Sequence, residues 1–294
     1  MIAAMVWSTA AVLLLTSTPG PQRTIASKQF DPQAVAADAA SIFWITGNAI
    51  MQSRLAKGSP SRLVFSPWAK ALVIDQRRVY WRTTTGSYYD EQKRERKQIA
   101  AIWSVPRAGG KPTMLAQVGD IGASWFAIDA DRAYWIGEDG ISAVPLSGGS
   151  IQVLVPKRIT FDLVVAGPEM YWREYSGKGE AIFSCSTKGG EPTLVAAVPD
   201  GIASLLVSRG EVFWTTQAGK LMRSPGASKD AAQLAAEAPL LRALAADSGS
   251  IYGLSDCCTL VRVPRAGGAL ERLYSSDLPV AAIALTEQAA CASG

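Results

Sequence analysis

Short apolar stretches alternate with polar turns along most of the chain, and one aromatic motif recurs among them. The motif is a small or branched apolar residue, then Phe or Tyr, then Trp. It ends at Trp44, Trp81, Trp135, Trp172 and Trp214, and a sixth copy, Ile251-Tyr252-Gly253, lacks the Trp. Its third positions are spaced 37, 54, 37, 42 and 39 residues apart. A repeat of this length indicates a propeller, a solenoid or an array.

Each repeat predicts four short strands. An apolar stretch leads to a position six residues before the end of the motif, and the residue there is most often Asp: Asp38, Asp75, Asp129 and Asp247. The motif itself forms a second strand. A third strand ends near a Pro, as at Val105-Pro106, and a Gly pair such as Gly109-Gly110 then permits the positive φ of a tight hairpin before a fourth strand.

Four strands in about 40 residues are typical of a propeller blade rather than a sandwich. Adjacent residues of a strand point to opposite faces, so the Tyr and the Trp of one motif both meet a neighbouring blade. We therefore expect an all-β propeller whose motif aromatics are buried between blades.

The Asp, Tyr-Trp and Pro-x-x-Gly-Gly positions between Ala34 and Tyr274 carry a family resemblance. In them the chain resembles YWTD-type propellers, the class B repeat of the low-density-lipoprotein receptor, and the related TolB-like and NHL-like propellers. The resemblance implies the propeller fold. The Thr-Asp that follows Trp in that family is absent here, because Ile45 follows Trp44 and Arg82 follows Trp81. A ligand is therefore not transferred from the family.

The two ends of the chain predict how the ring closes. Residues 23–26 match a fourth strand, residues 280–285 match a first strand, and residues 290–292 fall where the motif would be. We expect one domain over residues 22–292, with six complete blades and a seventh sector closed by both termini. A six-bladed ring is the alternative. Pairing the first and last strands would remove open sheet edges.

An apolar run of about 14 residues, Ile2 to Leu15, has the length of the hydrophobic region of a signal peptide and is too short to span a bilayer. We expect residues 1–20 to be a signal peptide, and the protein to be exported to the periplasm, the envelope or the medium with no membrane span. No Lys or Arg precedes the run and Pro21 follows Gly20, so the cleavage site is open. A cytoplasmic or membrane-retained chain is the alternative.

Composition excludes several classes of chemistry. The net charge of +4 accompanies no basic aromatic cluster, so we expect no nucleic-acid partner. The chain has no His, which removes Ser-His and Cys-His nucleophiles, His-ligated zinc and the commonest general base. The absence of His also argues against a function like that of the antibiotic-lyase-like propellers, which resemble this fold and rely on His. We expect no cofactor, no metal and no catalytic residue. Cys185 fits a buried third strand, whereas the disulfide state of Cys257, Cys258 and Cys291 is open.

The repeated Asp residues have two interpretations. Their recurrence in register favours capping of the turn between the first and second strands over a ring of cation ligands. Near the starts of the first strands only Asp162 is acidic. The alternative function, a hydrolase or lactonase that uses carboxylates and a divalent ion in the central channel, therefore has little support.

Departures from the repeat mark the candidate binding residues. The second repeat inserts a hairpin between Arg82 and Ala100, and connections from strand two to three and from strand four to one emerge on the same face. The candidates there are Trp68, Tyr88, Tyr89, Arg94, Trp125, Arg158, Phe161 and Arg173. We expect a monomeric, non-catalytic module that binds a protein or glycan. The alternative is a solvated hairpin beside core aromatics.

Overall fold

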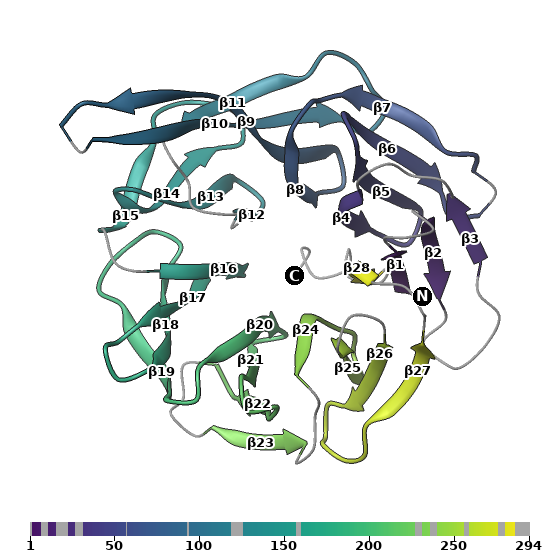
Figure 1. Cartoon of the computed structure of the whole chain (residues 1–294), viewed down its shortest axis with the longest axis vertical. Coiled ribbons are helices and arrows are strands. Elements are labelled where there is room, and N and C mark those ends of the chain that lie inside the picture. Colours follow the sequence, from purple (N-terminus) through teal and green to yellow (C-terminus); the bar gives the residue numbers. More distant parts are fainter. Residues whose placement is uncertain are drawn as a thin grey trace.

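The computed structural model is a ring of β-sheets around a central axis (Figure 1). It describes residues 2–6, 11–15, 23–26, 32–56, 58–92, 94–118, 126–156, 160–226, 231–235, 240–255, 259–275 and 280–285. Between residues 32 and 275 lie six four-stranded antiparallel blades, which confirms the predicted all-β propeller. In each blade the first strand lies nearest the ring centre and the fourth lies at the rim (Figure 1).

The blades follow one another in chain order. Blades 1 and 2 contain β4 (Pro32–Ala37), β5 (Ser41–Thr46), β6 (Ala49–Arg54) and β7 (Ser61–Phe65), then β8 (Ala69–Ile74), β9 (Arg78–Asp90), β10 (Glu95–Pro106) and β11 (Thr113–Val118). Blades 3 and 4 contain β12 (Phe126–Ile128), β13 (Arg132–Gly137), β14 (Gly140–Pro145) and β15 (Gln152–Pro156), then β16 (Thr160–Ala166), β17 (Glu169–Tyr175), β18 (Glu180–Ser186) and β19 (Thr193–Val198). Blades 5 and 6 contain β20 (Ile202–Ser208), β21 (Glu211–Thr216), β22 (Leu221–Ser224) and β23 (Ala232–Ala235), then β24 (Leu241–Ala246), β25 (Ser250–Ser255), β26 (Thr259–Pro264) and β27 (Glu271–Ser275).

The two ends of the chain meet in a further four-stranded sheet, which we call the terminal sheet. Its order is β28 (Val280–Leu285), β1 (Ile2–Val6), β2 (Ala11–Leu15) and β3 (Arg23–Ala26). Its two middle strands come from the run that the sequence assigned to a signal peptide, with Ile2 opposite both Leu285 and Leu15. Residues 290–292, which we expected to supply a strand there, lie outside the described residues.

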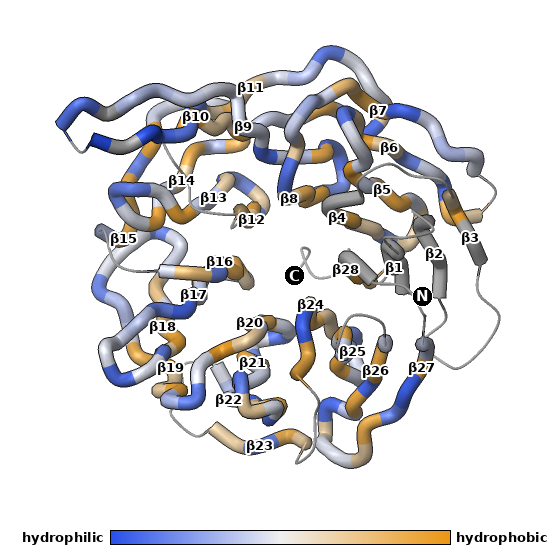
Figure 2. Tube along the Cα trace, viewed as in Figure 1, coloured by the Kyte–Doolittle hydropathy of each residue, from blue (hydrophilic) through white to orange (hydrophobic). Residues whose placement is uncertain are grey.

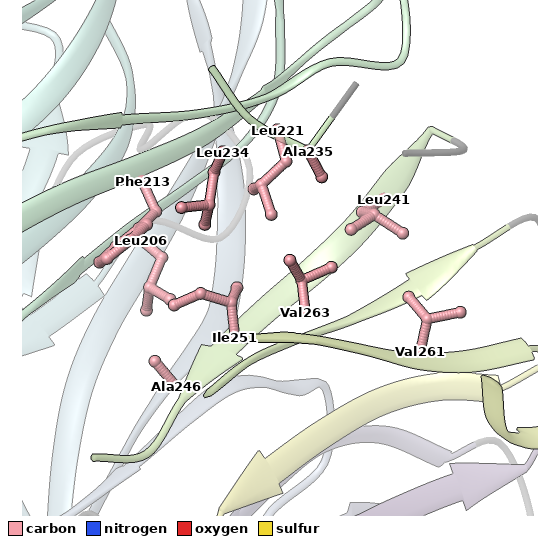
Figure 3. Close-up of a cluster of buried hydrophobic side chains, with 10 residues drawn as sticks. All are labelled: Leu206, Phe213, Leu221, Leu234, Ala235, Leu241, Ala246, Ile251, Val261 and Val263. Carbon is pink, nitrogen blue, oxygen red and sulfur yellow. The ribbon is translucent and has the colours of Figure 1, made fainter. Parts of the chain in front are cut away.

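The aromatic motifs fill the spaces between blades. The side chains of Trp44, Trp81, Trp135, Trp172 and Trp214 are between 0% and 3% exposed. Figure 3 shows one such interface, in which Phe213 and Leu206 of blade 5 lie with Ile251 and Val263 of blade 6. Burying one large aromatic side chain contributes about 2–3 kcal/mol. The inter-blade interfaces are therefore the hydrophobic core of the ring.

The repeated Asp residues cap the turn between the first and second strands. Oδ1 of Asp247 accepts the backbone N–H of Gly249 at 2.8 Å and of Ser250 at 2.7 Å, and Oδ2 accepts the hydroxyl of Tyr252 at 2.6 Å. Burial, together with the hydrogen bond to Asp247, raises the pKa of Tyr252 to about 12. The same arrangement pairs Asp75 with Tyr80 and Asp129 with Tyr134.

We call the contact between the motif aromatic and the turn that joins the first and second strands the corner. In blades 1 and 5 the corner is built differently, because their motifs contain Phe, which has no hydroxyl. The guanidinium of Arg107, from blade 2, lies 4.9 Å from the ring centroid of Phe43 and forms an ion pair with Asp38. The guanidinium of Arg265, from blade 6, likewise lies 4.9 Å from the centroid of Phe213. It forms an ion pair with Glu211 at 2.8 Å.

The residue that follows the third strand differs between the two kinds of corner. It is Arg107 or Arg265 in the blades that follow a motif Phe, and it is Leu146 or Thr187 in the blades that follow Tyr80 or Tyr134. A motif Tyr and an Arg of the next blade are therefore two alternative ways to complete the same inter-blade contact.

Candidate binding face

The alternating direction of the strands gives the ring two distinct faces. Turns between strands one and two and between strands three and four lie on one face, which carries the repeated Asp residues; we call it the Asp face. Connections between strands two and three, and from strand four to the next blade, lie on the opposite face. We call this second face the ribbon face, after the hairpin that extends from it.

The ribbon comprises residues 84–99 of β9 and β10, which continue beyond the strands beside them. β8 pairs with β9 only as far as Thr83, and β11 pairs with β10 only as far as Ala100. Beyond this point Gly86–Asp90 pair with Glu95–Ile99 in a two-stranded hairpin, as expected for the insertion. In Figure 1 the hairpin projects past the outline of the ring at the upper left, and Figure 2 shows its tip as hydrophilic.

One ion pair holds the ribbon against blade 3. The ammonium of Lys97, on β10, pairs with Glu138 in the turn between β13 and β14, and the Lys97 side chain is only 3% exposed. Within the ribbon the Thr85 hydroxyl donates to the carbonyl of Ile99 at 3.1 Å. Lys97 pairs with Tyr88 at the middle of the two-stranded ladder, so the ribbon is attached to blade 3 near its middle.

The exposed aromatic side chains of the described residues lie on the ribbon face, at positions in blades 1, 2 and 4. The most exposed aromatics among the described residues are Phe65 at 61%, Trp68 at 67%, Tyr88 at 47%, Tyr89 at 57% and Tyr175 at 54%. Phe65 ends β7, Tyr175 ends β17, Trp68 lies in the turn from β7 to β8, and the other two lie in the ribbon. All five positions belong to the ribbon face. The exposed large aliphatic residues of the described chain, Met114, Ile151, Val153 and Leu194, lie instead in or beside the outer strands of blades 2 to 4.

Four of the eight predicted binding residues, Trp68, Tyr88, Tyr89 and Arg94, lie exposed on this face. Trp68 and Arg94 both adopt positive φ, at 55° and 54°, which non-glycine residues adopt at a cost in strain. Trp125 and Arg158 lie outside the described residues. Phe65 and Tyr175 were missed by the sequence, although a large apolar residue that directly closes a strand is a signal for them.

Phe161 and Arg173 lie in contact with each other but are bound into the framework. The guanidinium of Arg173 lies 5.3 Å from the ring centroid of Phe161. It forms ion pairs with Asp162 at 2.8 Å and Glu180 at 3.2 Å, and donates to the carbonyl of Ile202 at 2.7 Å. These contacts connect blade 4 to blade 5 and neutralise the one acidic residue predicted near the channel. Arg173, one of the predicted binding residues, therefore also has a structural role.

Neither a metal cluster nor a membrane-spanning helix occurs in the described part of the chain. Its residues form no cluster of three or more Cys, Asp or Glu side chains that could hold a metal ion. None of its elements is a helix long and apolar enough to cross a membrane.

Comparisons with known proteins show the fold. No protein-family model matches the chain, and no curated protein matches it. Among solved structures, one from a nidogen/laminin complex has a TM-score of 0.57 at 14% identity and covers 84% of this chain and 99% of its own. The WD40 propeller domain of Doa1 has a TM-score of 0.63 at 11% identity, covering 92% and 89%. An oligogalacturonate lyase from Vibrio parahaemolyticus has a TM-score of 0.64 at 10% identity, covering 83% and 80%. Identities this low establish the propeller and assign neither a family nor an activity.

Proposed function

We propose that this protein is a non-catalytic binding module that holds a protein or glycan partner on its ribbon face. The observation that carries the proposal is the placement of the five exposed aromatic side chains on that one face. Burying aromatic anchors supplies much of the energy of protein–protein and protein–glycan contacts, and a Trp or Tyr also offers a polar group for orientation. The chain keeps its motif aromatics almost completely buried, so exposure at these five positions is not a general property of its aromatic residues.

The solved structures of similar fold include binding proteins and enzymes, since nidogen forms a complex with laminin and the lyase is an enzyme. Two features of this chain favour binding. It contains no His that could act as a general base or metal ligand. Asp162, the acidic residue nearest the predicted channel entrance, is paired with Arg173 at 2.8 Å. No group of described residues therefore supports a metal-dependent hydrolase.

We also propose that the terminal sheet acts as the seventh sector of the ring. Leu285 packs with Tyr252 and Leu260 of blade 6, and Ile25 and Ala26 pack with Val35 and Trp44 of blade 1. Both neighbours of the sheet are thereby covered. This role competes with cleavage of residues 1–20 as a signal peptide, because cleavage would remove β1 and β2. N-terminal sequencing of the protein recovered from its cells distinguishes the two.

Site-specific photocrosslinking tests the binding function. A photoreactive phenylalanine analogue is placed in separate variants at Trp68, at Tyr175 and, as matched controls on exposed apolar positions of the outer strands, at Val153 and Leu194. We expect a discrete crosslinked species from the two ribbon-face positions and none from the two controls, when the variants are irradiated in the cells that make them. Equal crosslinking at all four positions, or none at Trp68 and Tyr175, would count against the proposal.

A further inference from the structure

We propose that the corner between blades 4 and 5 is a binding site for a guanidinium group from outside the chain, carried by an arginine side chain of a partner or by a free guanidino compound. The carboxylate of Glu169 and the ring of Tyr171 would hold the group. The site lies on the Asp face, opposite the five exposed aromatics, so the inference goes beyond the proposed function and does not rest on it.

The corner between blades 5 and 6 shows how this fold binds a guanidinium group. The guanidinium of Arg265 lies 4.9 Å from the ring centroid of Phe213 and pairs with the carboxylate of Glu211 at 2.8 Å. It also donates to the hydroxyl of Ser208 and to the carbonyl of Asp247, both at 3.0 Å. A carboxylate at the start of the second strand and an aromatic ring two residues later therefore bind the cation together.

Blade 4 repeats this pair of residues. Glu169 begins β17 as Glu211 begins β21, and Tyr171 stands two residues later, where blade 5 has Phe213. Burial, together with the charge of Glu169, raises the pKa of Tyr171, so the carboxylate acts on the phenol. The second strands of the other four blades begin with a residue that is not acidic: Ser41, Arg78, Arg132 and Ser250.

The chain does not supply an arginine to the corner of blade 4. Arg265 directly follows Pro264 in blade 6, and at the corresponding place in blade 5 Gly226 follows Pro225. The position of the capping Asp is also changed, because blade 4 has Ala166 there. Blade 4 therefore has the acidic and aromatic parts of a guanidinium site, without the side chains that complete the other corners.

The two side chains consequently have no partner in the described part of the chain. Each of the other three motif Tyr hydroxyls donates to an Asp. The hydroxyl of Tyr171 and the carboxylate of Glu169 form no hydrogen bond or ion pair with a described residue. Tyr171 is 5% exposed, against 0% or 1% for the aromatic at this position in the other five blades. A buried phenol and a half-buried carboxylate without partners are costly, and the five N–H donors of a guanidinium can satisfy the carboxylate.

The chemistry of this corner favours a guanidinium over an ammonium or a metal ion. A planar guanidinium stacks on an aromatic ring and donates to a carboxylate in its own plane, which a compact ammonium does not do. The described residues form no cluster of three or more acidic or Cys ligands around a metal position. One carboxylate beside one ring therefore matches the guanidinium best.

Ligand titrations followed by saturation-transfer NMR test the site. The probe is N-acetyl-arginine methylamide, and N-acetyl-lysine methylamide is the comparison. We expect saturable binding of the arginine probe, binding of the lysine probe that is weaker by about fivefold or more, and a loss of about fivefold for the arginine probe in Glu169→Gln. Glu191→Gln is the matched control, because it removes an exposed carboxylate from the same face of the same blade and should bind as the wild type does.

A second variant and a second probe define the site further. Tyr171→Phe copies the ring of blade 5 and should keep the affinity within about twofold, because the cation contacts the ring and not the hydroxyl. The tripeptide Gly-Arg-Gly separates the two sources: tighter binding than free L-arginine indicates a partner side chain, and weaker binding indicates a free guanidino compound. Equal affinity of the wild type and Glu169→Gln, or equal binding of the arginine and lysine probes, would overturn the inference. Crosslinking through Trp68 does not depend on either result, so the proposed function is tested separately.

Discussion

Exchanging one inter-blade corner for the other is the sharpest test of how the blades are joined. At the corner between blades 1 and 2, Arg107 pairs with Asp38, covers Phe43 and donates to the carbonyl of Asp75 at 3.1 Å. Replacing Arg107 with Leu copies the residue that follows the third strand of blade 3. Replacing Phe43 with Tyr in addition should rebuild the corner that Asp75 and Tyr80 form between blades 2 and 3.

The magnitudes follow from what each change leaves behind. The side chains of Arg107 and Asp38 are only 18% and 10% exposed, so removing the guanidinium leaves a carboxylate that is largely withdrawn from water. Asp38 keeps the backbone N–H groups of Ala40 and Ser41 at 2.9 Å each. We therefore take the lower end of the usual cost of breaking a buried pair and expect Arg107→Leu to lower the free energy of unfolding by about 3 kcal/mol. The hydroxyl that Phe43→Tyr introduces should restore about 1.5–2 kcal/mol through a hydrogen bond to the carboxylate.

Phe43→Tyr alone should gain nothing, because Arg107 already occupies the second oxygen of Asp38. The four proteins form a double-mutant cycle, measured by urea unfolding with tryptophan fluorescence and circular dichroism. We expect the double variant to be more stable than Arg107→Leu, with a coupling free energy of about 2 kcal/mol. A double variant no more stable than Arg107→Leu would refute the claim that Tyr and Arg are alternative solutions of one corner.

Three further predictions concern pH, the terminal sheet and the core. Burial would by itself raise the pKa of Asp38 and of Asp247, but hydrogen bonds to backbone N–H groups, with those from Arg107 and Tyr252, lower both pKa values below 3.8. The stability that the two carboxylates contribute is therefore fully present above about pH 4 and is lost as the pH falls through their lowered pKa values. In acid titrations, the free energy of unfolding of Asp247→Asn should therefore depend less steeply on pH than that of the wild type. Deleting residues 1–20 should remove β1 and β2 and lower the free energy of unfolding by more than about 4 kcal/mol, beyond most point substitutions; equal urea midpoints for the two chains would contradict the seventh-sector role. Trp172→Ala, which empties a fully buried site, should cost about 3–5 kcal/mol, whereas the surface change Trp68→Ala should stay within about 0.5 kcal/mol; similar losses in the two variants would show that their burial has been assigned wrongly.

The sequence predicted the blades because two periods coincide in it. The alternation within each strand and the recurrence of the aromatic motif about every 40 residues both require buried sheets. The hairpin signals mark where one strand ends and the next begins. It also assigned β3 and β28 to the outer and inner positions of a sheet at the termini. The middle strands β1 and β2 were not predicted, because an apolar run of about 14 residues has the same composition whether it is a leader or a pair of central strands.

The Arg corners could not be predicted before the blades were placed, since Phe43 and Arg107 are 64 residues apart in the sequence. The pattern is readable afterwards, as a motif Phe followed in the next repeat by an Arg after the third strand. On the ribbon face, Trp68, Tyr88 and Tyr89 were found because they depart from the repeat. Phe65 and Tyr175 were missed because each lies inside a regular strand pattern, at its last position. Arg173 was predicted for its charge alone, and its contacts with Asp162 and Glu180 depend on three strands converging.

Hydroxyl-radical footprinting tests the central claim, that the aromatic residues exposed on one face form the binding surface. The modification of each side chain is compared between the purified protein and the same protein labelled inside its own cells. We expect Phe65, Trp68, Tyr88, Tyr89 and Tyr175 to be modified in the purified protein and protected in cells, the five motif Trp residues to be unmodified in both, and Met114 and Leu194 to be modified equally in both. Modification of the motif Trp residues in the folded protein, or protection in cells at Met114 and Leu194 in place of the ribbon face, would contradict the account.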